Sequence, residues 1–264
     1  MANSVYKDYI NLPAHTDLLS KILNLGISMF PMPVPQQVDL NLRTKDLLET
    51  AKTWETSEKR KDFLASLHEA WNATPVKNIR KIVCFGLGPL YTEEAEASPD
   101  DLTRYDLGLN KYRTLLAFDM AHMLANEFKN PVPLIFQDVN CNQQDRDWLA
   151  EYAKHKEIEM RFLEDPHALL EVDKYTLVLA HGLPGFNVRS VIVDITKREG
   201  GPAGFFCEDI PEFTMTEEEL KSATQFPVDP PSRRIASMAE NYWMRSMCYV
   251  PGWQVGLKLK PQRV

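Results

Sequence analysis

Cysteine is scarce in this sequence of 264 residues. There are four, each far from the next: Cys84, Cys141, Cys207 and Cys248. None has the CxxC or Cys/His spacing of a zinc site, so we expect no bound metal. Two of them, Cys84 and Cys207, lie within apolar runs, which is typical of reduced and buried thiols.

Long hydrophobic runs and positive charge are also in short supply. No segment reaches the roughly 18 apolar residues of a membrane-spanning helix, and the N-terminus lacks the basic start and apolar stretch of a signal peptide. Lysine and arginine number 30 against 37 acidic residues, a formal net charge of −7. This balance argues against a protein that coats nucleic acid through its overall field, but it does not exclude a local basic face. We expect a cytoplasmic protein without a membrane partner, and its oligomeric state stays open.

Hydrophobic residues make up 44% of the chain, enough for a large core. From Ile79 onward, short apolar runs alternate with helical segments. We predict strands over 82–87, 133–137, 159–163, 176–181 and 203–208, and helices near 111–128, 143–155, 166–171 and 187–198. Continuous apolar strands are typical of a parallel sheet covered on both faces. The pattern predicts an α/β fold over residues 76–210, with a Rossmann-like, doubly wound, mainly parallel five-stranded sheet.

The segments on either side of this core have a different pattern. Residues 1–75 predict an N-terminal helical extension, with a short amphipathic helix, a proline-rich stop and a long charged helix from about Thr44 to Trp71. The middle of this long helix, ETSEKRKD, is typical of a solvent-exposed face, and the alternative is a basic surface that contacts phosphate. Residues 211–264 predict a C-terminal helical tail, with a helix from about Ser232 to Cys248, which packs on the core or forms a lid.

The predicted strand ends are rich in acids. In open α/β sheets ligands bind beyond the carboxyl ends of the strands. In chain order these ends read Gly86-Leu87-Gly88, Gln137-Asp138, Glu164-Asp165, His181 and Glu208-Asp209. Each acid alone could be a helix cap, and the histidine could be structural. Together they predict an acidic crevice that suits a guanidinium or an amine, although one acid could instead hold a ribose hydroxyl pair.

The glycine turn after the first strand is a weak signal for a dinucleotide. GxGxxG requires a third glycine where Tyr91 stands, Pro89 has no N–H, and about 20 polar residues precede the next predicted helix. A dinucleotide fold enters that helix directly, whereas a long loop is more typical of a lid or a substrate loop. A methyltransferase that uses S-adenosylmethionine is an alternative: Gly86, Gly88 and Asp138 would serve it, but Leu90 stands at the third glycine of GxGxG.

The ordered motifs KIVCFGLGPL, PLIFQDV, RFLEDP and TLVLAHG carry a resemblance. They are similar to the domain first described in the plant "sensitivity to red light reduced" protein, which has a Gly-Leu-Gly, a Gln-Asp pair, an acid before a turn, and a histidine after successive strands. The match covers about residues 76 to 210. The chain departs from it at Pro89, where the family has a small polar residue, and after His181, where the family commonly has Cys-Pro.

The layout of the chain resembles a fungal branch of this family that includes the arginine-containing cyclodipeptide synthases. The resemblance implies an aminoacyl-tRNA-dependent enzyme that joins arginine from arginyl-tRNA to a second aminoacyl group and closes a diketopiperazine. Its partners would be arginyl-tRNA and a second charged tRNA, and it would use no cofactor. The alternative is a non-catalytic regulatory or interaction protein built on the same domain.

The synthase hypothesis assigns roles to the strand ends. His181 would accept a proton, because histidine ordinarily titrates near neutrality, and Glu164 and Asp138 would complete the catalytic set. The other substrate-binding residues would be Gly86, Gly88, Gln137, Asp165, Glu208, Asp209 and Tyr91. The phosphates of tRNA would contact Lys77, Arg80, Lys81, Lys197 and Arg198.

Overall fold

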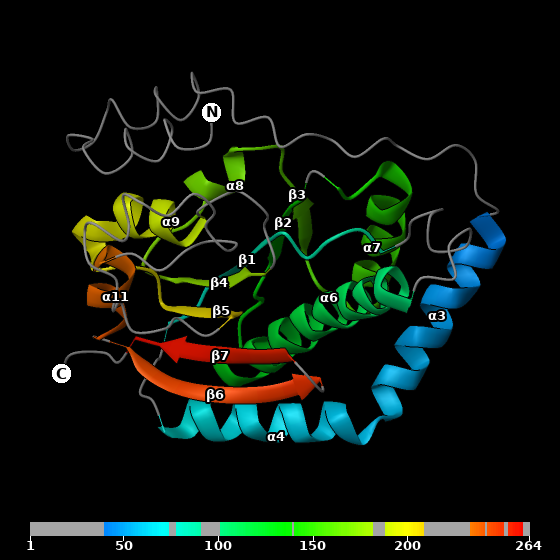
Figure 1. Cartoon of the computed structure of the whole chain (residues 1–264), viewed down its shortest axis with the longest axis horizontal. Coiled ribbons are helices and arrows are strands. Elements are labelled where there is room, and N and C mark those ends of the chain that lie inside the picture. Colours follow the sequence, from blue (N-terminus) through cyan, green and yellow to red (C-terminus); the bar gives the residue numbers. More distant parts are fainter. Residues whose placement is uncertain are drawn as a thin grey trace.

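A seven-stranded sheet lies at the centre of the computed structural model (Figure 1). The structure describes residues 40–73, 78–90, 101–138, 140–181, 188–208, 233–240, 242–250 and 253–260. The strands are β1 (Lys81–Phe85), β2 (Leu134–Gln137), β3 (Met160–Phe162), β4 (Thr176–Ala180), β5 (Gly204–Glu208), β6 (Trp243–Val250) and β7 (Trp253–Leu259). Their order in the sheet is β3-β2-β1-β4-β5-β7-β6.

The first five strands are parallel, as the sequence predicts. The chain builds outward from β1 to β3, then crosses back and continues with β4 on the other side of β1. This reversal between β1 and β4 is the topological switch point, where open α/β sheets bind their ligands. The predicted Rossmann-like fold is therefore confirmed.

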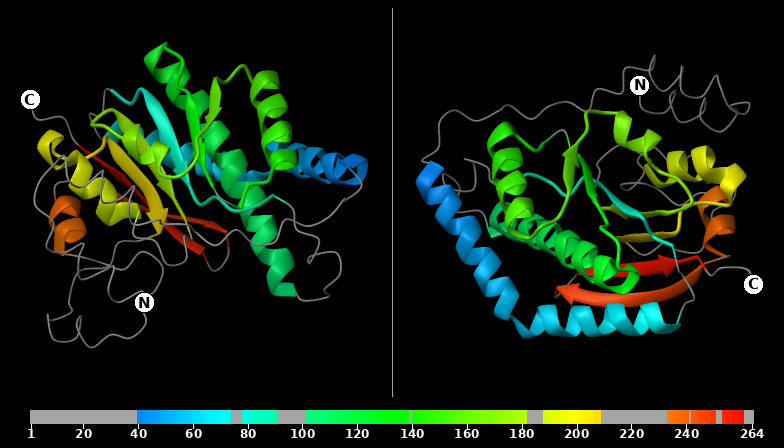
Figure 2. Two further views of the ribbon diagram at one scale, coloured as in Figure 1. Left: turned by 90° about the horizontal axis from the view of Figure 1, so that it is seen from above. Right: turned by 180° about the vertical axis from the view of Figure 1, so that it is seen from behind.

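Helices cover both faces of the sheet (Figures 1 and 2). They are α3 (Leu40–Thr56), α4 (Glu58–Ala73), α6 (Asp101–Phe128), α7 (Gln143–His155), α8 (His167–Leu170), α9 (Val188–Thr196) and α11 (Arg233–Ala239), with a 3₁₀ turn, η1, over Lys197–Glu199. One hydrophobic cluster joins the sheet to α3, α4, α6 and α7, and a second joins its other face to α8 and α9.

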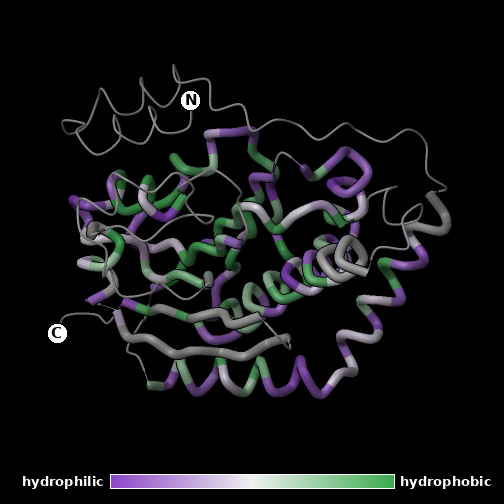
Figure 3. Tube along the Cα trace, in the orientation of Figure 1, coloured by the Kyte–Doolittle hydropathy of each residue, from purple (hydrophilic) through white to green (hydrophobic). Residues whose placement is uncertain are grey.

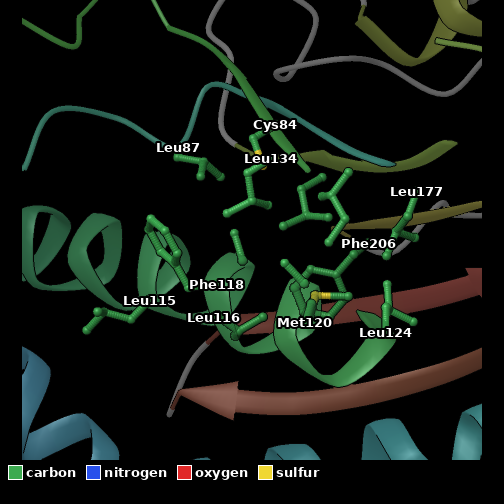
Figure 4. Close-up of a cluster of buried hydrophobic side chains, with 14 of the residues drawn as sticks. Cys84, Leu87, Leu115, Leu116, Phe118, Met120, Leu124, Leu134, Leu177 and Phe206 are labelled. Carbon is green, nitrogen blue, oxygen red and sulfur yellow. The ribbon is translucent and has the colours of Figure 1, made fainter. Parts of the chain in front are cut away.

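Burial on both faces explains the continuous apolar strands. Within β1, Ile82 and Cys84 belong to the cluster under α6, whereas Val83 and Phe85 belong to the opposite one. Figure 4 shows the α6 side, where Phe206 of β5 meets side chains of α6. Figure 3 shows the same distribution along the trace, with hydrophobic residues in the central strands and hydrophilic ones along α3 and α4.

The long charged helix predicted from Thr44 to Trp71 is two helices, broken at Ser57. The Ser57 hydroxyl donates to the Trp54 carbonyl at 2.8 Å and accepts from the Arg60 N–H at 3.1 Å, which caps the start of α4. The new direction turns Arg60 inward, where it forms a bidentate ion pair with Asp119 of α6 at 2.7 and 2.8 Å. The ETSEKRKD segment is thus not wholly a solvated face.

The C-terminal tail also differs from the prediction. The helix predicted over 232–248 ends at Ala239, and Trp243–Val250 forms β6 instead. Pairing decides this outcome, because β7 lies antiparallel between β5 and β6 and gives both neighbours a hydrogen-bonded partner. The Pro251-Gly252 pair that separates the two strands is typical of a hairpin turn and was the signal in the sequence. The tail therefore extends the core sheet, and α4 lies along β6 (Figure 1).

Two further predictions concern segments that are only partly described. The predicted short helix within residues 1–34 lies outside the described residues. The predicted loop over 91–110 is helical from Asp101, where α6 begins ten residues earlier than expected. Among the described residues, no helix combines the length and the apolar character needed to cross a membrane. The cytoplasmic location stays a prediction.

Replacing Ser57 with alanine removes the cap of α4. We expect Ser57→Ala to lower the free energy of unfolding by about 1 kcal/mol, because the Arg60 N–H loses its acceptor. Urea denaturation followed by circular dichroism measures the change. The matched control is Thr53→Ala, at an exposed position within α3, which we expect to be neutral or slightly stabilising. Equal effects of the two substitutions would contradict the capping role.

Candidate functional site

The turn after β1 holds two glycines in left-handed backbone conformations. Gly86 has φ 63° and Gly88 has φ 84°, which side chains with a Cβ rarely adopt. Space is also closed at the second position, because a Cβ on Gly88 would lie 2.2 Å from Nδ2 of Asn110. This amide in turn donates to the Pro89 carbonyl at 3.1 Å. The turn therefore packs against the side of α6.

Asp138 ties this turn to the end of β2. Its Oδ2 accepts the Gly88 N–H at 2.6 Å, and its Oδ1 accepts the Asn140 N–H at 2.8 Å. The side chain is only 8% exposed. Burial raises the pKa of the Asp138 carboxyl, while the two backbone hydrogen bonds and the charge of Arg146 oppose that rise. A carboxylate has about four lone-pair sites, so these bonds do not exhaust its capacity.

The neighbouring Gln137 and Asp165 bond to each other. Nε2 of Gln137 donates to Oδ1 of Asp165 at 2.8 Å, and its Oε1 accepts the Ala168 N–H at 2.9 Å. Burial raises the pKa of Asp165, and the bond from Gln137 opposes it. Because the Gln137 amide joins β2 to the turn before α8, these bonds hold the scaffold of the strand ends in place.

Glu164 is committed to a different partner. It is exposed and forms an ion pair with Arg146 of α7 at 2.6 Å. The Arg146 Nε–H also donates to the Cys141 carbonyl at 3.3 Å. The three predicted acids whose side chains are described, Asp138, Glu164 and Asp165, thus form hydrogen bonds or an ion pair with different protein groups.

His181 follows β4 and is buried, with 2% of its surface exposed. Its N–H continues the sheet by donating to the Phe85 carbonyl, and its ring lies edge-on to Phe206 at 5.5 Å between centroids. Burial is the largest cause that lowers the pKa of His181 well below its usual value, followed by the charges of Arg113 and Arg189. The lowered pKa makes the imidazole a weaker base, which counts against the predicted role of His181 as a proton acceptor near neutrality.

Sequence reasoning missed three polar residues near these strand ends. Asn110 and Arg113 lie on α6, and Arg189 lies in the first turn of α9. Asn110 fell in the predicted loop, so its place beside the glycine turn was not foreseen. The position of Arg189 could have been noticed in the sequence, because a cation in the first turn of a predicted helix is unfavourable to the helix dipole. Such a residue is therefore a candidate for a role other than helix stabilisation.

The predicted tRNA contacts lie at the other end of the sheet. Arg80 and Lys81 stand at the amino end of β1, where Arg80 stacks on the Tyr175 ring at 4.1 Å and Lys81 pairs with Asp173 at 3.1 Å. Lys197 and Arg198 form η1, which leads into the amino end of β5. The remaining predictions fall outside the description: Lys77, Tyr91 and Asp209 are not described, and of Glu208 only its backbone in β5 is.

Comparison with known proteins gives remote structural matches. No protein-family model and no curated protein matches the chain. Among the solved structures, a Geobacter sulfurreducens methyltransferase is 9% identical with a TM-score of 0.37, covering 95% of this chain and 99% of its own. A putative O-methyltransferase from Nostoc punctiforme is 12% identical with a TM-score of 0.39 and coverages of 92% and 67%. An SAH-bound methyltransferase from Podospora anserina is 8% identical with a TM-score of 0.34 and coverages of 96% and 99%. Structural similarity at this level does not assign an activity to the chain.

The prediction of an aminoacyl-tRNA-dependent cyclodipeptide synthase is corrected on these findings. The solved structures described above carry the name methyltransferase, and none of these three carries the name of a cyclodipeptide synthase. The geometry of the strand ends agrees with the correction. The acids expected to hold an arginine guanidinium are bonded to the protein, and the described cations expected to hold arginyl-tRNA lie at the amino ends of the strands. The resemblance to the "sensitivity to red light reduced" domain stays a prediction.

Substituting Gly88 tests the construction of the turn. We expect Gly88→Ala to destabilise the fold by about 1–3 kcal/mol, through its left-handed backbone and its contact with Asn110. The double variant Gly88→Ala/Asn110→Ala should recover only the part due to the contact. Gly108→Ala is the matched control: a Cβ there meets nothing within 4 Å, so the helix should gain up to about 1 kcal/mol. A tolerated Gly88→Ala would refute the packing.

The buried His181 makes stability depend on pH. In the unfolded chain the imidazole binds a proton below about pH 6.5, whereas the lowered pKa keeps it neutral in the folded state. The unfolded state then binds more protons, so the free energy of unfolding falls on acidification, by up to about 1.4 kcal/mol per pH unit. Denaturation between about pH 7.5 and 5.5 should show a shallower slope for His181→Gln than for the wild type. In wild-type NMR spectra the imidazole signals should remain those of the neutral ring at pH 6; signals of a protonated ring would contradict the burial.

Proposed function

We propose that this protein is a methyltransferase that binds S-adenosylmethionine at the carboxyl ends of β1 and β2. The observation that carries the proposal is the pairing of a glycine turn after β1 with a buried acid after β2, Gly88 with Asp138, beside the switch point of the sheet. When bound, this cofactor supplies an activated methyl group. The acceptor of that group stays open.

The described residues fit the chemical groups of this cofactor. Its ribose presents two hydroxyl donors, and Asp138 supplies a carboxylate acceptor with lone pairs left after its bonds to Gly88 and Asn140. At Gly86 the turn presents backbone rather than a side chain, which is the kind of position where a ligand can approach the chain closely.

The relation between the turn and α6 favours this cofactor over a dinucleotide. A pyrophosphate requires the N-terminus of the following helix, whose N–H groups and dipole attract negative charge. Here the turn contacts Asn110, nine residues after the first residue of α6 at Asp101, which is about 14 Å along the helix axis. S-adenosylmethionine has no phosphate and therefore does not depend on that helix end.

A second candidate is the non-catalytic regulatory or interaction protein implied by the resemblance of the sequence. The observation that favours it is that the protein itself supplies the hydrogen-bond acceptor and the packing partner of the turn at Gly88. Asp138 accepts the Gly88 N–H, and the Asn110 amide lies where a Gly88 side chain would be. A protein that needs this turn only as a structural joint would keep the same contacts.

Calorimetric titration with S-adenosylhomocysteine, the product form of the cofactor, separates the two candidates. We expect saturable binding to the wild type and a loss of affinity of at least about tenfold in Asp138→Ala, because the ribose hydroxyls lose their acceptor. Glu164→Gln is the matched control, since this exposed acid pairs with Arg146 and should leave affinity unchanged. Absence of binding by the folded wild type would refute the methyltransferase proposal and favour the second candidate.

A further inference from the structure

Asn110 of α6 lies beside the glycine turn and is buried, with 8% of its surface exposed. Its Nδ2 donates to the Pro89 carbonyl at 3.1 Å, and its Oδ1 accepts from Nη1 of Arg113 at 3.1 Å. The same amide takes up the space beside Gly88, where a Cβ would lie 2.2 Å from Nδ2. Asn110 thus joins the backbone after β1 to α6 by a hydrogen bond as well as by packing.

The two partners of this amide fix its orientation. A guanidinium only donates hydrogen bonds, and a backbone carbonyl only accepts them. The oxygen of Asn110 therefore faces Arg113, and the nitrogen faces Pro89. Aspartate has the same shape but no nitrogen donor, and leucine has a similar size but neither a donor nor an acceptor. The position thus requires the two unlike ends of an asparagine side chain.

The Pro89 carbonyl lies one residue after the group that contacts the buried acid of the site. The Gly88 N–H donates to Oδ2 of Asp138 at 2.6 Å. Glycine itself imposes little restraint on its φ and ψ angles, so contacts from outside the residue decide where this N–H points. The bond from Asn110 to the Pro89 carbonyl supplies such a restraint on the C-terminal side of Gly88.

Helix α6 is itself held in place on either side of this contact. The neighbouring Lys111 forms an ion pair with Asp46 of α3, and the Tyr112 ring lies 5.6 Å from the ring of Trp54, between centroids. Trp54 is also a buried residue of α3. Helix α3 therefore braces the segment of α6 that carries Asn110.

We infer that Asn110 is a positioning residue for the candidate ligand site. By holding the Pro89 carbonyl, it keeps the Gly88 N–H on Asp138 and so sets the position of the carboxylate that would receive the ribose hydroxyls. The inference rests on the proposed function only for the identity of the ligand. Because Asn110 acts through the turn, its effect on binding is smaller than that of Asp138.

Hydrogen exchange of the Gly88 amide, measured by NMR in the ligand-free full-length protein, tests the first step. We expect Asn110→Asp and Asn110→Leu to speed this exchange by about fivefold, the factor that corresponds to the net contribution of one hydrogen bond. Asn110→Asp keeps the acceptor for Arg113 and loses the donor to Pro89, whereas Asn110→Leu loses both. The Val83 amide, in the buried strand β1, is the internal reference and should change less, since global destabilisation would speed both amides.

The matched control is Thr114→Val, at another buried polar position of α6, about one turn further along the helix. Exchange of the Gly88 amide in this variant should equal that of the wild type. The inference is overturned if Gly88 exchanges in the Asn110 variants as it does in the wild type, or if it speeds up no more than Val83 does. Should Asn110→Leu fail to fold, Asn110→Asp, which keeps the shape of the side chain, decides the matter.

Calorimetric titration with S-adenosylhomocysteine tests the consequence for the ligand. We expect both Asn110 variants to lose about threefold to tenfold in affinity, less than Asp138→Ala loses, and Thr114→Val to bind as the wild type does. Asn110→Leu carries no charge, so a loss shared by both variants is not due to repulsion of the ligand. Faster Gly88 exchange with unchanged affinity would overturn the positioning role.

The titration also separates this inference from the proposed function. Unchanged affinity in the Asn110 variants, with saturable binding to the wild type, leaves the methyltransferase proposal intact. If the wild type binds no S-adenosylhomocysteine, that proposal is refuted. Faster exchange at Gly88 in Asn110→Asp still supports the positioning of the Gly88–Asp138 contact by Asn110 in that case.

Discussion

The hydrogen bond from the Gly88 N–H to the Asp138 carboxylate is the constraint on which the candidate site depends. It joins the turn after β1 to the end of β2, two segments that are 50 residues apart in the sequence. With the turn held there, the Asn110 amide packs where Gly88 has no side chain, and Arg113 is oriented by that amide. One backbone donor thus sets the relative positions of a strand end, a glycine turn and the side of α6.

The partners of the acidic side chains at the strand ends, and not the number of acids, decide which ligand charge this edge of the sheet can accept. The sequence places five acids after three of the five predicted strands, and their number favoured a cationic ligand. In the structure, Asp138 accepts backbone N–H groups, Asp165 accepts from Gln137, and Glu164 pairs with Arg146. The two arginines whose charges act on His181, Arg113 and Arg189, belong to helices α6 and α9. A prediction based on the residues that follow each strand does not include them. The acids counted in the sequence therefore predicted a site for a guanidinium, whereas the structure places two arginines near the same edge of the sheet.

The sequence predicts most of the core because apolar runs and helix caps are local signals. Helix α7 begins and ends where expected, and Asn142 caps it by accepting the Asp145 N–H. The errors fall where a local signal competes with tertiary structure. Gly108 and Asn110 weaken helix propensity, yet α6 runs through them because Leu109 is buried against the core. The strand β6 exists because β7 offers it a partner, which a helical periodicity in 232–248 does not reveal.

A crystal structure of the protein soaked with S-adenosylhomocysteine is the most direct test of the central claim. We predict that the nucleoside lies beyond the carboxyl ends of β1 and β2, with its ribose hydroxyls within hydrogen-bonding distance of the Asp138 carboxylate. A nucleoside bound at another edge of the sheet, or an Asp138 carboxylate that contacts only Gly88 and Asn140 under saturating ligand, would contradict it.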